Sequence, residues 1–224
     1  MKREAIWDCT RILLLLWIML ASGCAATPTP YLNEGITPTP PDTLPELVAV
    51  LSLPDVEARL GAMTVLGHMG SEAEVAVPAL VENLEYPNTA VRIRAAWALG
   101  MIGPTAQSAA PALIEVLLND SFGESRAEAA VALGKIGDLS TVPALAQGLN
   151  DEDWRVQIAS AESMMQLVPQ LRSLSEVDAP KGYTLDKSGT PMIVTTIREW
   201  WKNEGQDQDW GTMTMMPTPL PVIP

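Results

Sequence analysis

Histidine, cysteine and clustered carboxylates are the residue types in this chain that could do chemistry, and the first two are scarce. His68 is the only histidine, and Cys9 and Cys24 are the only cysteines. A histidine and cysteine metal cage needs three or four ligands, and a disulfide framework needs more than two cysteines. Sequence spacing places no nucleophile or carboxylate beside His68, so we interpret it as a polar residue at a helix end.

Acidic residues gather at Glu72 and Glu74, at Glu82 and Glu85, and at 151–153. Such groups could act as a glycosidase pair or as metal ligands. At 151–153, however, a helix is expected to begin, and carboxylates there cap the helix and match its dipole. The spacing fits no calcium loop, and the chain has no glycine-rich phosphate loop, Gly-x-Ser-x-Gly elbow or Cys-x-x-Cys pair. We therefore predict that the protein is not an enzyme and has no catalytic residue, metal or cofactor.

The charge balance narrows the class of partner. The chain of 224 residues has 14 basic and 27 acidic side chains, a formal net charge of −13. Nucleic-acid binding depends on neutralising phosphates, and adhesion to anionic lipid depends on a basic patch, so both are disfavoured. Because 47% of the residues are hydrophobic, the chain can form a packed core.

The first residues have the composition of an export signal. Lys2, Arg3 and Arg11 flank an apolar stretch at 12–21. Ten apolar residues form about 15 Å of helix, half of what a bilayer core requires. The arrangement predicts a signal peptide over residues 1–23 rather than a membrane span.

The residues around Cys24 resemble the lipobox of bacterial lipoproteins. The run is Leu20-Ala21-Ser22-Gly23-Cys24, with Ala21 where that family usually has leucine. The resemblance implies that Cys24 is diacylated and begins the mature chain, held on the extracytoplasmic face of a bacterial membrane. The alternative is plain secretion, with Cys24 lying by chance near an ordinary cleavage site.

Proline then dominates a short segment. Six prolines stand at positions 28, 30, 38, 40, 41 and 45, most of them beside threonine. Proline fixes φ and has no amide hydrogen, which favours an extended spacer.

Behind the spacer, one motif recurs four times. Its prolines, Pro45, Pro78, Pro111 and Pro143, are 33, 33 and 32 residues apart. Each begins a short apolar helix, followed by a turn and an arginine; the arginines are Arg59, Arg92, Arg126 and Arg155. Gly67, Gly100 and Gly134 lie eight residues after the first three arginines, and Gly70, Gly103 and Gly137 three residues further on.

These features predict two helices per unit. Proline is tolerated in the first turn of the first helix, and Asp or Asn at the turn caps the second. Three, seven and ten residues after each arginine comes an apolar stripe: Ala62, Leu66, Met69; Ala95, Leu99, Ile102; Ala129, Leu133, Ile136. Glycine allows neighbouring helices to approach and ends the second helix. Since no unit can bury its stripe alone, we predict an all-α solenoid of about four two-helix repeats.

The run Val91 to Gly103, VRIRAAWALGMIG, resembles the HEAT-like repeats of the phycobilin-lyase type. The resemblance extends over about residues 43–170. It implies a binding scaffold, although a minority of such proteins are enzymes. HEAT-like hydroxylases with two irons require His-Glu pairs, and this chain has none.

The end of the solenoid is expected to be closed. In the fourth unit Glu162 takes the leucine position and Ser163 the glycine position, as in a polar terminal repeat. A further helix is expected after Thr190 as N-cap, with Gly205 as its stop. Its neighbouring tryptophans, Trp200 and Trp201, cannot both face the last repeat.

Together these predictions divide the chain into five parts. They are a lipoprotein signal peptide (1–23), a Pro/Thr-rich spacer (24–43), the repeat solenoid (44–173), an extension with a capping helix (174–205) and a disordered tail (206–224).

Two functions remain open. The first is a monomeric, membrane-anchored scaffold that binds a protein or peptide in the cell envelope. The second is a phycobilin-lyase-like enzyme or chromophore chaperone. The export signal counts against the second, because that chemistry belongs to the cytoplasm, and we favour the scaffold.

One helix face is the candidate binding surface. Positions one, five and nine after each arginine lie opposite the buried stripe, and by resemblance the second helices line the concave side. With Arg94 beside them, the main candidates are Leu60, Thr64, His68, Ile93, Trp97, Met101, Val131 and Lys135. The same rule gives Ala127, Val156, Ser160 and Met164. The alternative is that Trp97 fills a gap between repeats as ordinary core.

Overall fold

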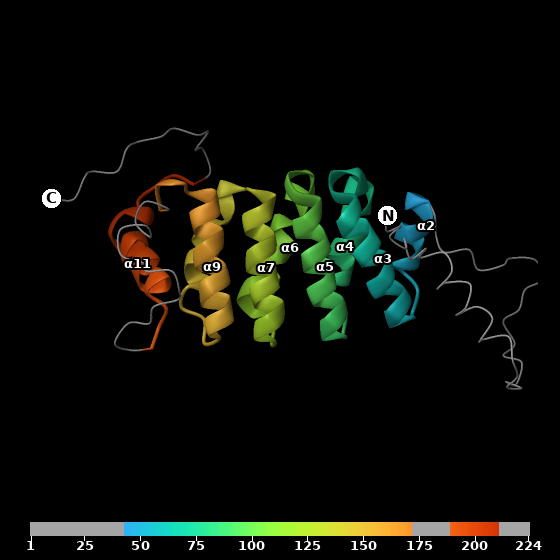
Figure 1. Cartoon of the computed structure of the whole chain (residues 1–224), viewed down its shortest axis with the longest axis horizontal. Helices are drawn as coiled ribbons and strands as arrows, with labels where there is room; N and C mark the ends of the chain where they lie inside the picture. The colour runs from blue at the N-terminus through green and yellow to red at the C-terminus, as the bar shows by residue number, and fades with distance from the viewer. Residues whose placement is uncertain (1–42, 172–188, 211–224) are drawn as a thin grey trace, which may run out of the picture. The chain divides into compact units, whose positions relative to one another are not determined.

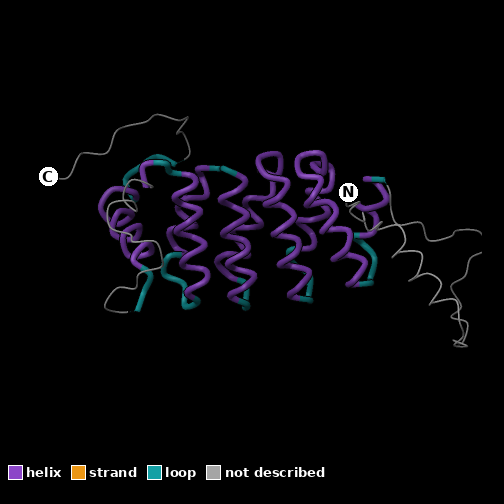
Figure 2. The backbone as a smooth tube through the Cα atoms, in the orientation of Figure 1, coloured by secondary structure: helices purple, strands orange, loops and turns teal. Residues whose placement is uncertain are grey.

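The computed structural model describes residues 43–171 and 189–210, which contain helices and no strand (Figures 1 and 2). The predicted signal peptide, the lipidation site at Cys24 and most of the spacer and tail lie outside these residues. The all-α solenoid predicted from the repeats is confirmed.

Each repeat begins with a short helix that has proline in its first turn, as predicted. These first helices are α2 (Leu44–Val50), α4 (Val77–Asn83), α6 (Ala110–Asn119) and α8 (Val142–Gly148). In front of α2, Thr43 and Glu46 form a reciprocal capping box.

The second helices are α3 (Val56–Met69), α5 (Thr89–Ile102), α7 (Gly123–Ile136) and α9 (Trp154–Leu167). Asp55, Asn88 and Asp153 cap three of them with their side chains, as predicted. The exception is α7, whose N-cap is Phe122. There the Asp120 side chain accepts a hydrogen bond from the Phe122 amide at 2.9 Å and also binds an arginine of the preceding repeat.

Short 3₁₀ helices join the repeats: η1 (Gly70–Ala76), η2 (Gly103–Ala109) and η3 (Leu139–Thr141). At Gly70, Gly103 and Gly137 φ is 60°, 77° and 84°, values that glycine adopts without strain. The run 89–119 is long and apolar enough to cross a membrane by length and composition, with 44% of an apolar 18-residue stretch within it buried. Because Gly103 breaks this run into α5, η2 and α6, we assign it to the core of the solenoid.

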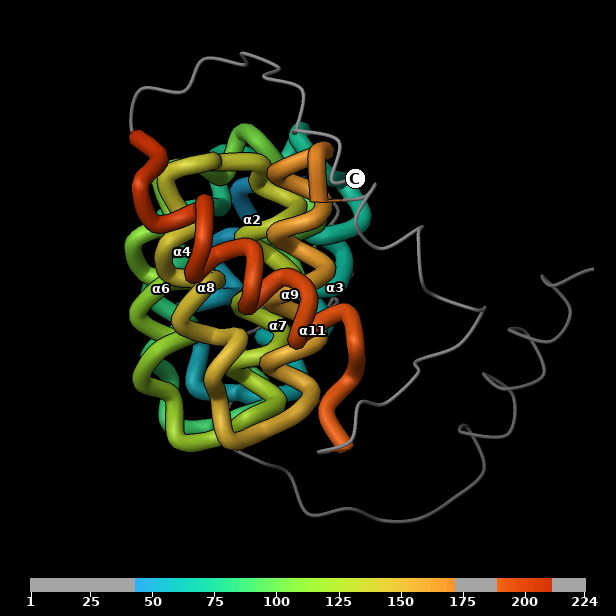
Figure 3. The backbone as a smooth tube through the Cα atoms, turned by 90° about the vertical axis from the view of Figure 1, so that its left-hand side faces the viewer, coloured from blue at the N-terminus to red at the C-terminus, as the bar shows by residue number. Residues whose placement is uncertain are grey.

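The helices form two layers. Figure 3 shows α4, α6 and α8 on one side and α3, α7 and α9 on the other, and the second helices follow one another in sequence order in Figure 1. The predicted apolar stripe fills the space between the layers. In the second repeat Ala95 and Leu99 are 0% exposed and Ile102 is 2% exposed.

The fourth repeat corrects one prediction. The position that Arg59, Arg92 and Arg126 hold in the first three repeats is held here by Gln157 and not by Arg155. The Gln157 side-chain amide donates a hydrogen bond to the Asp151 carbonyl, six residues back, at 2.7 Å. Arg126 makes the same contact at 2.8 Å. Gln157 lies 14 residues after Pro143, the same spacing as from Pro45 to Arg59 and from Pro78 to Arg92, whereas Arg155 comes two residues earlier.

With this register, Met164 takes the leucine position and is fully buried. Met165 takes the glycine position. The assignment of Glu162 to the leucine position and Ser163 to the glycine position was therefore wrong. Glu162 is exposed, as expected for a terminal repeat, while Ser163 is 4% exposed and donates to the Ala130 carbonyl of the preceding repeat.

A C-terminal helix packs on the last repeat, as predicted. Helix α11 (Met192–Trp200) continues into a π-helical turn, η4 (Trp201–Gly205), and contacts α9. Its Arg198 guanidinium donates to the Leu149 carbonyl. The N-cap is Pro191 and not Thr190.

Three tryptophans close this end. Trp200, Trp201 and Trp210 have ring centroids 6.0 to 6.4 Å apart, and Trp200 is buried while Trp201 is half-buried. Trp210 is 8% exposed, and its indole N–H donates to the Gly205 carbonyl at 2.9 Å. The packed part of the chain therefore runs to Trp210, beyond the predicted boundary at 205.

Candidate functional site

The predicted surface residues of the first three repeats lie on one face of α3, α5 and α7, here called the second-helix face. His68 and Met101 are exposed. The others are half-buried: Leu60, Thr64, Ile93, Arg94, Trp97, Ala127, Val131 and Lys135.

The fourth repeat differs. Val156, Ser160 and Met164 are each 0% exposed, so their assignment to this surface was wrong. The cause is the two-residue register shift. In the corrected register the equivalent positions are Ile158, Glu162 and Gln166, which are half-buried, exposed and exposed.

Trp97 lies at the centre of the second-helix face and bridges two repeats. Its ring covers Gly67 of α3 so closely that a Cβ built there would lie 2.3 Å from the ring. The His68 ring meets it edge to face, with centroids 5.4 Å apart, and the Arg94 guanidinium lies 5.2 Å from its centroid. Trp97 therefore fills an inter-repeat gap, as the second hypothesis has it, and also keeps an accessible part. That this part binds a partner stays a prediction.

Two cations lie on the second-helix face, Arg94 beside the Trp97 ring and Lys135 beside Met101. Neither Arg94 nor Lys135 forms an ion pair with another described residue, and the Lys135 amine lies 3.5 Å from the Met101 sulfur. Glu128 stands near both: burial raises its pKa above the usual value, although the charges of Lys135 and Arg94 act to lower it. The face thus combines a half-buried indole, an exposed thioether and two cations.

The other arginines of the repeats serve a different purpose. Arg92 binds Asp120 of the next repeat through two hydrogen bonds of 2.6 and 2.9 Å, and Arg126 binds Asp151 at 2.7 and 2.8 Å. Arg59 instead donates to the Asn83 amide oxygen at 2.5 Å. Each also donates to a carbonyl six residues back, so these side chains join successive repeats as an arginine ladder.

The ladder changes the titration of one acceptor, Asp120. Burial raises the pKa of Asp120, but hydrogen bonds from Arg92 and from the Phe122 amide, together with the Arg92 charge, outweigh it and hold the pKa below its usual value. The repeat spacing located these arginines but gave no sign of their acceptors, because the acceptors lie 24 to 28 residues away in the next unit.

Aromatic side chains lie over the ladder. The Arg59 guanidinium lies 4.4 Å from the centroid of the Tyr86 ring, and the Arg92 guanidinium lies 5.7 Å from the centroid of the Phe122 ring. Phe122 is 53% exposed. We infer that these cation–π contacts help to hold the Arg59 and Arg92 guanidinium groups in place.

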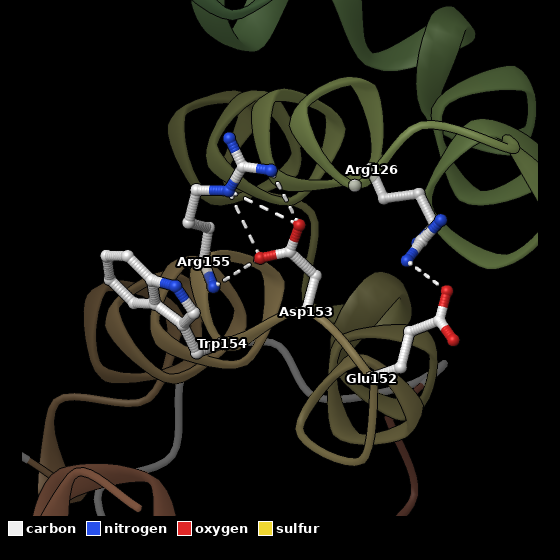
Figure 4. A pocket seen from close by; sticks show the side chains of 6 residues that line it. Arg126, Glu152, Asp153, Trp154 and Arg155 are labelled. Atoms are coloured by element: carbon white, nitrogen blue, oxygen red, sulfur yellow. Dashed lines mark hydrogen bonds and ion pairs between the residues drawn. The ribbon is translucent and has the colours of Figure 1, made fainter.

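A pocket of about 570 Å³ opens at the end of the ladder (Figure 4). It is lined by Gly123, Arg126, Glu152, Asp153, Trp154 and Arg155. Its charged groups face one another: Arg155 binds Asp153 at 2.7 Å, and Arg126 lies 3.4 Å from Glu152. A Cβ at Gly123 would lie 1.9 Å from the Asp153 carboxylate, so glycine allows α7 and α9 to meet here. Because the charges are paired internally, we assign the pocket to the junction between these helices.

Within the described ranges, no three His, Cys, Asp or Glu side chains are grouped so as to hold a metal ion.

The arrangement of paired helices has a counterpart among known families. HEAT repeats match residues 44–121 and 110–179. The chain belongs to the HEAT-repeat family. No curated protein matches its sequence.

Several solved structures resemble this HEAT-repeat protein. One is the complex of CpcE and CpcF of phycocyanin lyase from Nostoc sp. PCC7120, with 22% identity, a TM-score of 0.49, and coverage of 69% of this chain and 97% of that one. Two are engineered proteins, with 21% and 22% identity and TM-scores of 0.48 and 0.49. They cover 71% and 68% of this chain and 79% and 78% of their own. Likeness at this level concerns the fold alone.

Proposed function

We propose that this HEAT-repeat protein is an extracytoplasmic scaffold, anchored in the membrane through Cys24, that binds a protein partner on its second-helix face. HEAT repeats indicate a protein-interaction scaffold. The observation that carries the choice of surface is the grouping of Trp97, Met101, Arg94 and Lys135 across α5 and α7.

The composition of this face supports the proposal. Tryptophan, methionine and arginine are enriched in the cores of protein interfaces. Met101 is 38% exposed, and the cations beside it are not engaged in the ladder. A partner segment with an apolar side chain for Trp97 and Met101 and carboxylates for Arg94 and Lys135 fits this chemistry.

The binding surface is tested by reversing its charge. In the double variant Arg94→Glu, Lys135→Glu, we expect affinity for the partner, captured from detergent-solubilised membranes with the lipidated protein as bait, to fall about tenfold or more. The matched control is Arg155→Glu, an arginine with a side chain 47% exposed that lies off the face. Equal capture by the double variant and the wild type would contradict this choice of surface.

The anchor is tested separately. Cys24→Ser removes the thiol that would carry the acyl chains, so we expect the protein to leave the membrane fraction. If the serine variant fractionates with membranes as fully as the wild type, lipidation at this residue is wrong.

A further inference from the structure

The turns that join the first and second helix of each repeat lie next to one another along one edge of the solenoid (Figure 2). The arginine ladder holds them together. Arg59 donates to the Leu53 carbonyl in its own turn, and its guanidinium lies 4.4 Å from the Tyr86 ring of the next turn. Arg92 repeats this arrangement with the Tyr86 carbonyl and the Phe122 ring. The third and fourth turns meet at the pocket described above, which residues of both turns line.

Each of these turns presents one large apolar or aromatic side chain. Leu53 is 46% exposed, Phe122 is 53% exposed and Trp154 is 62% exposed. Tyr86, in the second turn, is half-buried. A single exposed apolar side chain needs no explanation, but one in each of four adjacent turns forms a row, and rows of this kind mark interaction sites.

Each turn also has an exposed carboxylate within four residues of its apolar side chain. Glu57, Glu85 and Glu124 are exposed and form no ion pair with another described residue. In the fourth turn the Glu152 side chain is 88% exposed and lies 3.4 Å from Arg126. The row of apolar side chains is therefore accompanied by a row of carboxylates that face solvent.

The arginines of the same edge are engaged within the protein. Arg59, Arg92 and Arg126 are largely covered, and each binds the next repeat as part of the ladder. Arg155 is more exposed but binds Asp153 at 2.7 Å. The charge that this edge offers to a partner is therefore negative, in agreement with the formal net charge of −13 for the whole chain.

These side chains define a surface, here called the turn edge: Leu53, Tyr86, Phe122 and Trp154 with Glu57, Glu85, Glu124 and Glu152. We propose that the turn edge binds a cationic segment of a partner protein. Each turn takes one lysine or arginine, whose charge meets the carboxylate while its stem lies on the apolar side chain. The second-helix face has the opposite chemistry, because its cations favour carboxylates, so this inference does not depend on the proposed function.

The distance between repeats sets the spacing of the cations. Packed helices lie about 8–10 Å apart, and α5 and α7 approach closely, since a Cβ at Gly100 would lie 2.9 Å from the Cα of Ala132. A polyproline II chain has three residues per turn and rises about 3.1 Å per residue, so every third side chain lies on the same side, about 9 Å further on. The turn edge therefore fits a polyproline II segment with lysine or arginine at every third residue.

Synthetic peptides test the charge and the spacing. The probe is a fluorescein-labelled peptide of four Lys-Pro-Pro units, and its binding to the full chain in mild detergent is followed by fluorescence anisotropy. The controls are four Glu-Pro-Pro units, and four consecutive lysines followed by eight prolines. We expect the spaced lysine peptide to bind severalfold more tightly than the clustered one, and the glutamate peptide not to bind. No binding of the spaced peptide, or equal binding of the two lysine peptides, would overturn the proposal.

Two triple variants with the same change in charge test the location. One removes three carboxylates of the turn edge: Glu85→Gln, Glu124→Gln and Glu152→Gln. The other removes three exposed carboxylates elsewhere: Glu72→Gln, Glu74→Gln and Glu199→Gln. The affinity for the spaced peptide should fall about tenfold or more in the first variant and change little in the second. Equal losses would show that the peptide responds only to the overall charge, and would refute the turn edge as its site.

Substitution of Trp154 tests the apolar row. Trp154→Ala should lower the affinity for the spaced peptide severalfold, whereas Trp154→Phe keeps an aromatic face and should bind nearly as well as the wild type. Because this residue is 62% exposed, both variants should keep the wild-type circular dichroism. The double variant Arg94→Glu, Lys135→Glu should not weaken peptide binding, so this proposal and the proposed function can fail separately. Unchanged affinity in Trp154→Ala would contradict the row as a binding surface.

Discussion

Close packing of the second helices predicts opposite outcomes for one substitution at two glycines. Replacing glycine by alanine inside a helix stabilises it by about 0.5–1 kcal/mol, because alanine has less backbone freedom to lose. At Gly61 an added Cβ meets nothing within 4 Å. We therefore expect Gly61→Ala to gain this amount in the free energy of unfolding.

At Gly100 the same methyl group has no room. Its Cβ would lie 2.9 Å from the Cα of Ala132 and 3.2 Å from its Cβ, so α5 and α7 would have to separate. Overpacking of this kind costs about 1–3 kcal/mol. After subtraction of the propensity gain, Gly100→Ala should lose up to about 2 kcal/mol.

Urea denaturation of the two variants at dilute concentration measures the difference. With a slope of about 2 kcal/mol per molar, a gap of 2 kcal/mol between them separates the midpoints by about 1 M. Gly67→Ala adds an intermediate case, since its Cβ would meet the Trp97 ring, which can swing outward. If Gly100→Ala proves as stable as Gly61→Ala, the close approach of α5 and α7 is refuted.

Three further predictions concern the core, the ladder and the indole. Leu99→Ala, at a fully buried site, should cost about 2–5 kcal/mol in urea denaturation, while Leu118→Ala, 37% exposed, should cost much less; similar losses would contradict the burial. Because the folded pKa of Asp120 is lowered, its pairing with Arg92 adds stability above the unfolded pKa of about 3.9, and this is lost as pH falls through the lower folded pKa. Stability measured from about pH 6 to pH 2 should thus fall less steeply for Asp120→Asn, and an unchanged slope would argue against the linkage. Trp97→Ala should lower stability by about 3 kcal/mol, the low end of the cost of truncating a packed aromatic side chain, because the half-buried ring lies on Gly67 of α3; an unchanged melting temperature would argue against this packing.

The repeated sequence was sufficient to predict the fold. Proline in the first turn, an Asp or Asn cap and a closing glycine are local signals, and three of the four second helices use the predicted cap. The fourth repeat was misaligned because Arg155 matched the residue type while Gln157 makes the contact. This position in the repeat is defined by the hydrogen bond to the carbonyl six residues back, and either an arginine or a glutamine side chain can donate that bond.

The surface was predicted in part. Helical spacing selected the face that includes Met101 and Lys135, because exposure along one helix follows its period. The spacing could not show that Trp97 leans over Gly67, since the closeness of two helices depends on residues about 30 positions apart. The acceptors of the arginine ladder were missed for the same reason.

Photo-cross-linking from two equally exposed positions tests the binding surface most directly. Met101 on the second-helix face is 38% exposed, and Leu118 on α6 in the other layer is 37% exposed. A photoreactive amino acid at each position, in the lipidated protein in intact envelopes, samples the two faces under matched conditions. We predict a discrete partner adduct from position 101 and none from position 118. An adduct from position 118 alone, or equal adducts from both, would contradict the assignment of the second-helix face as the binding surface.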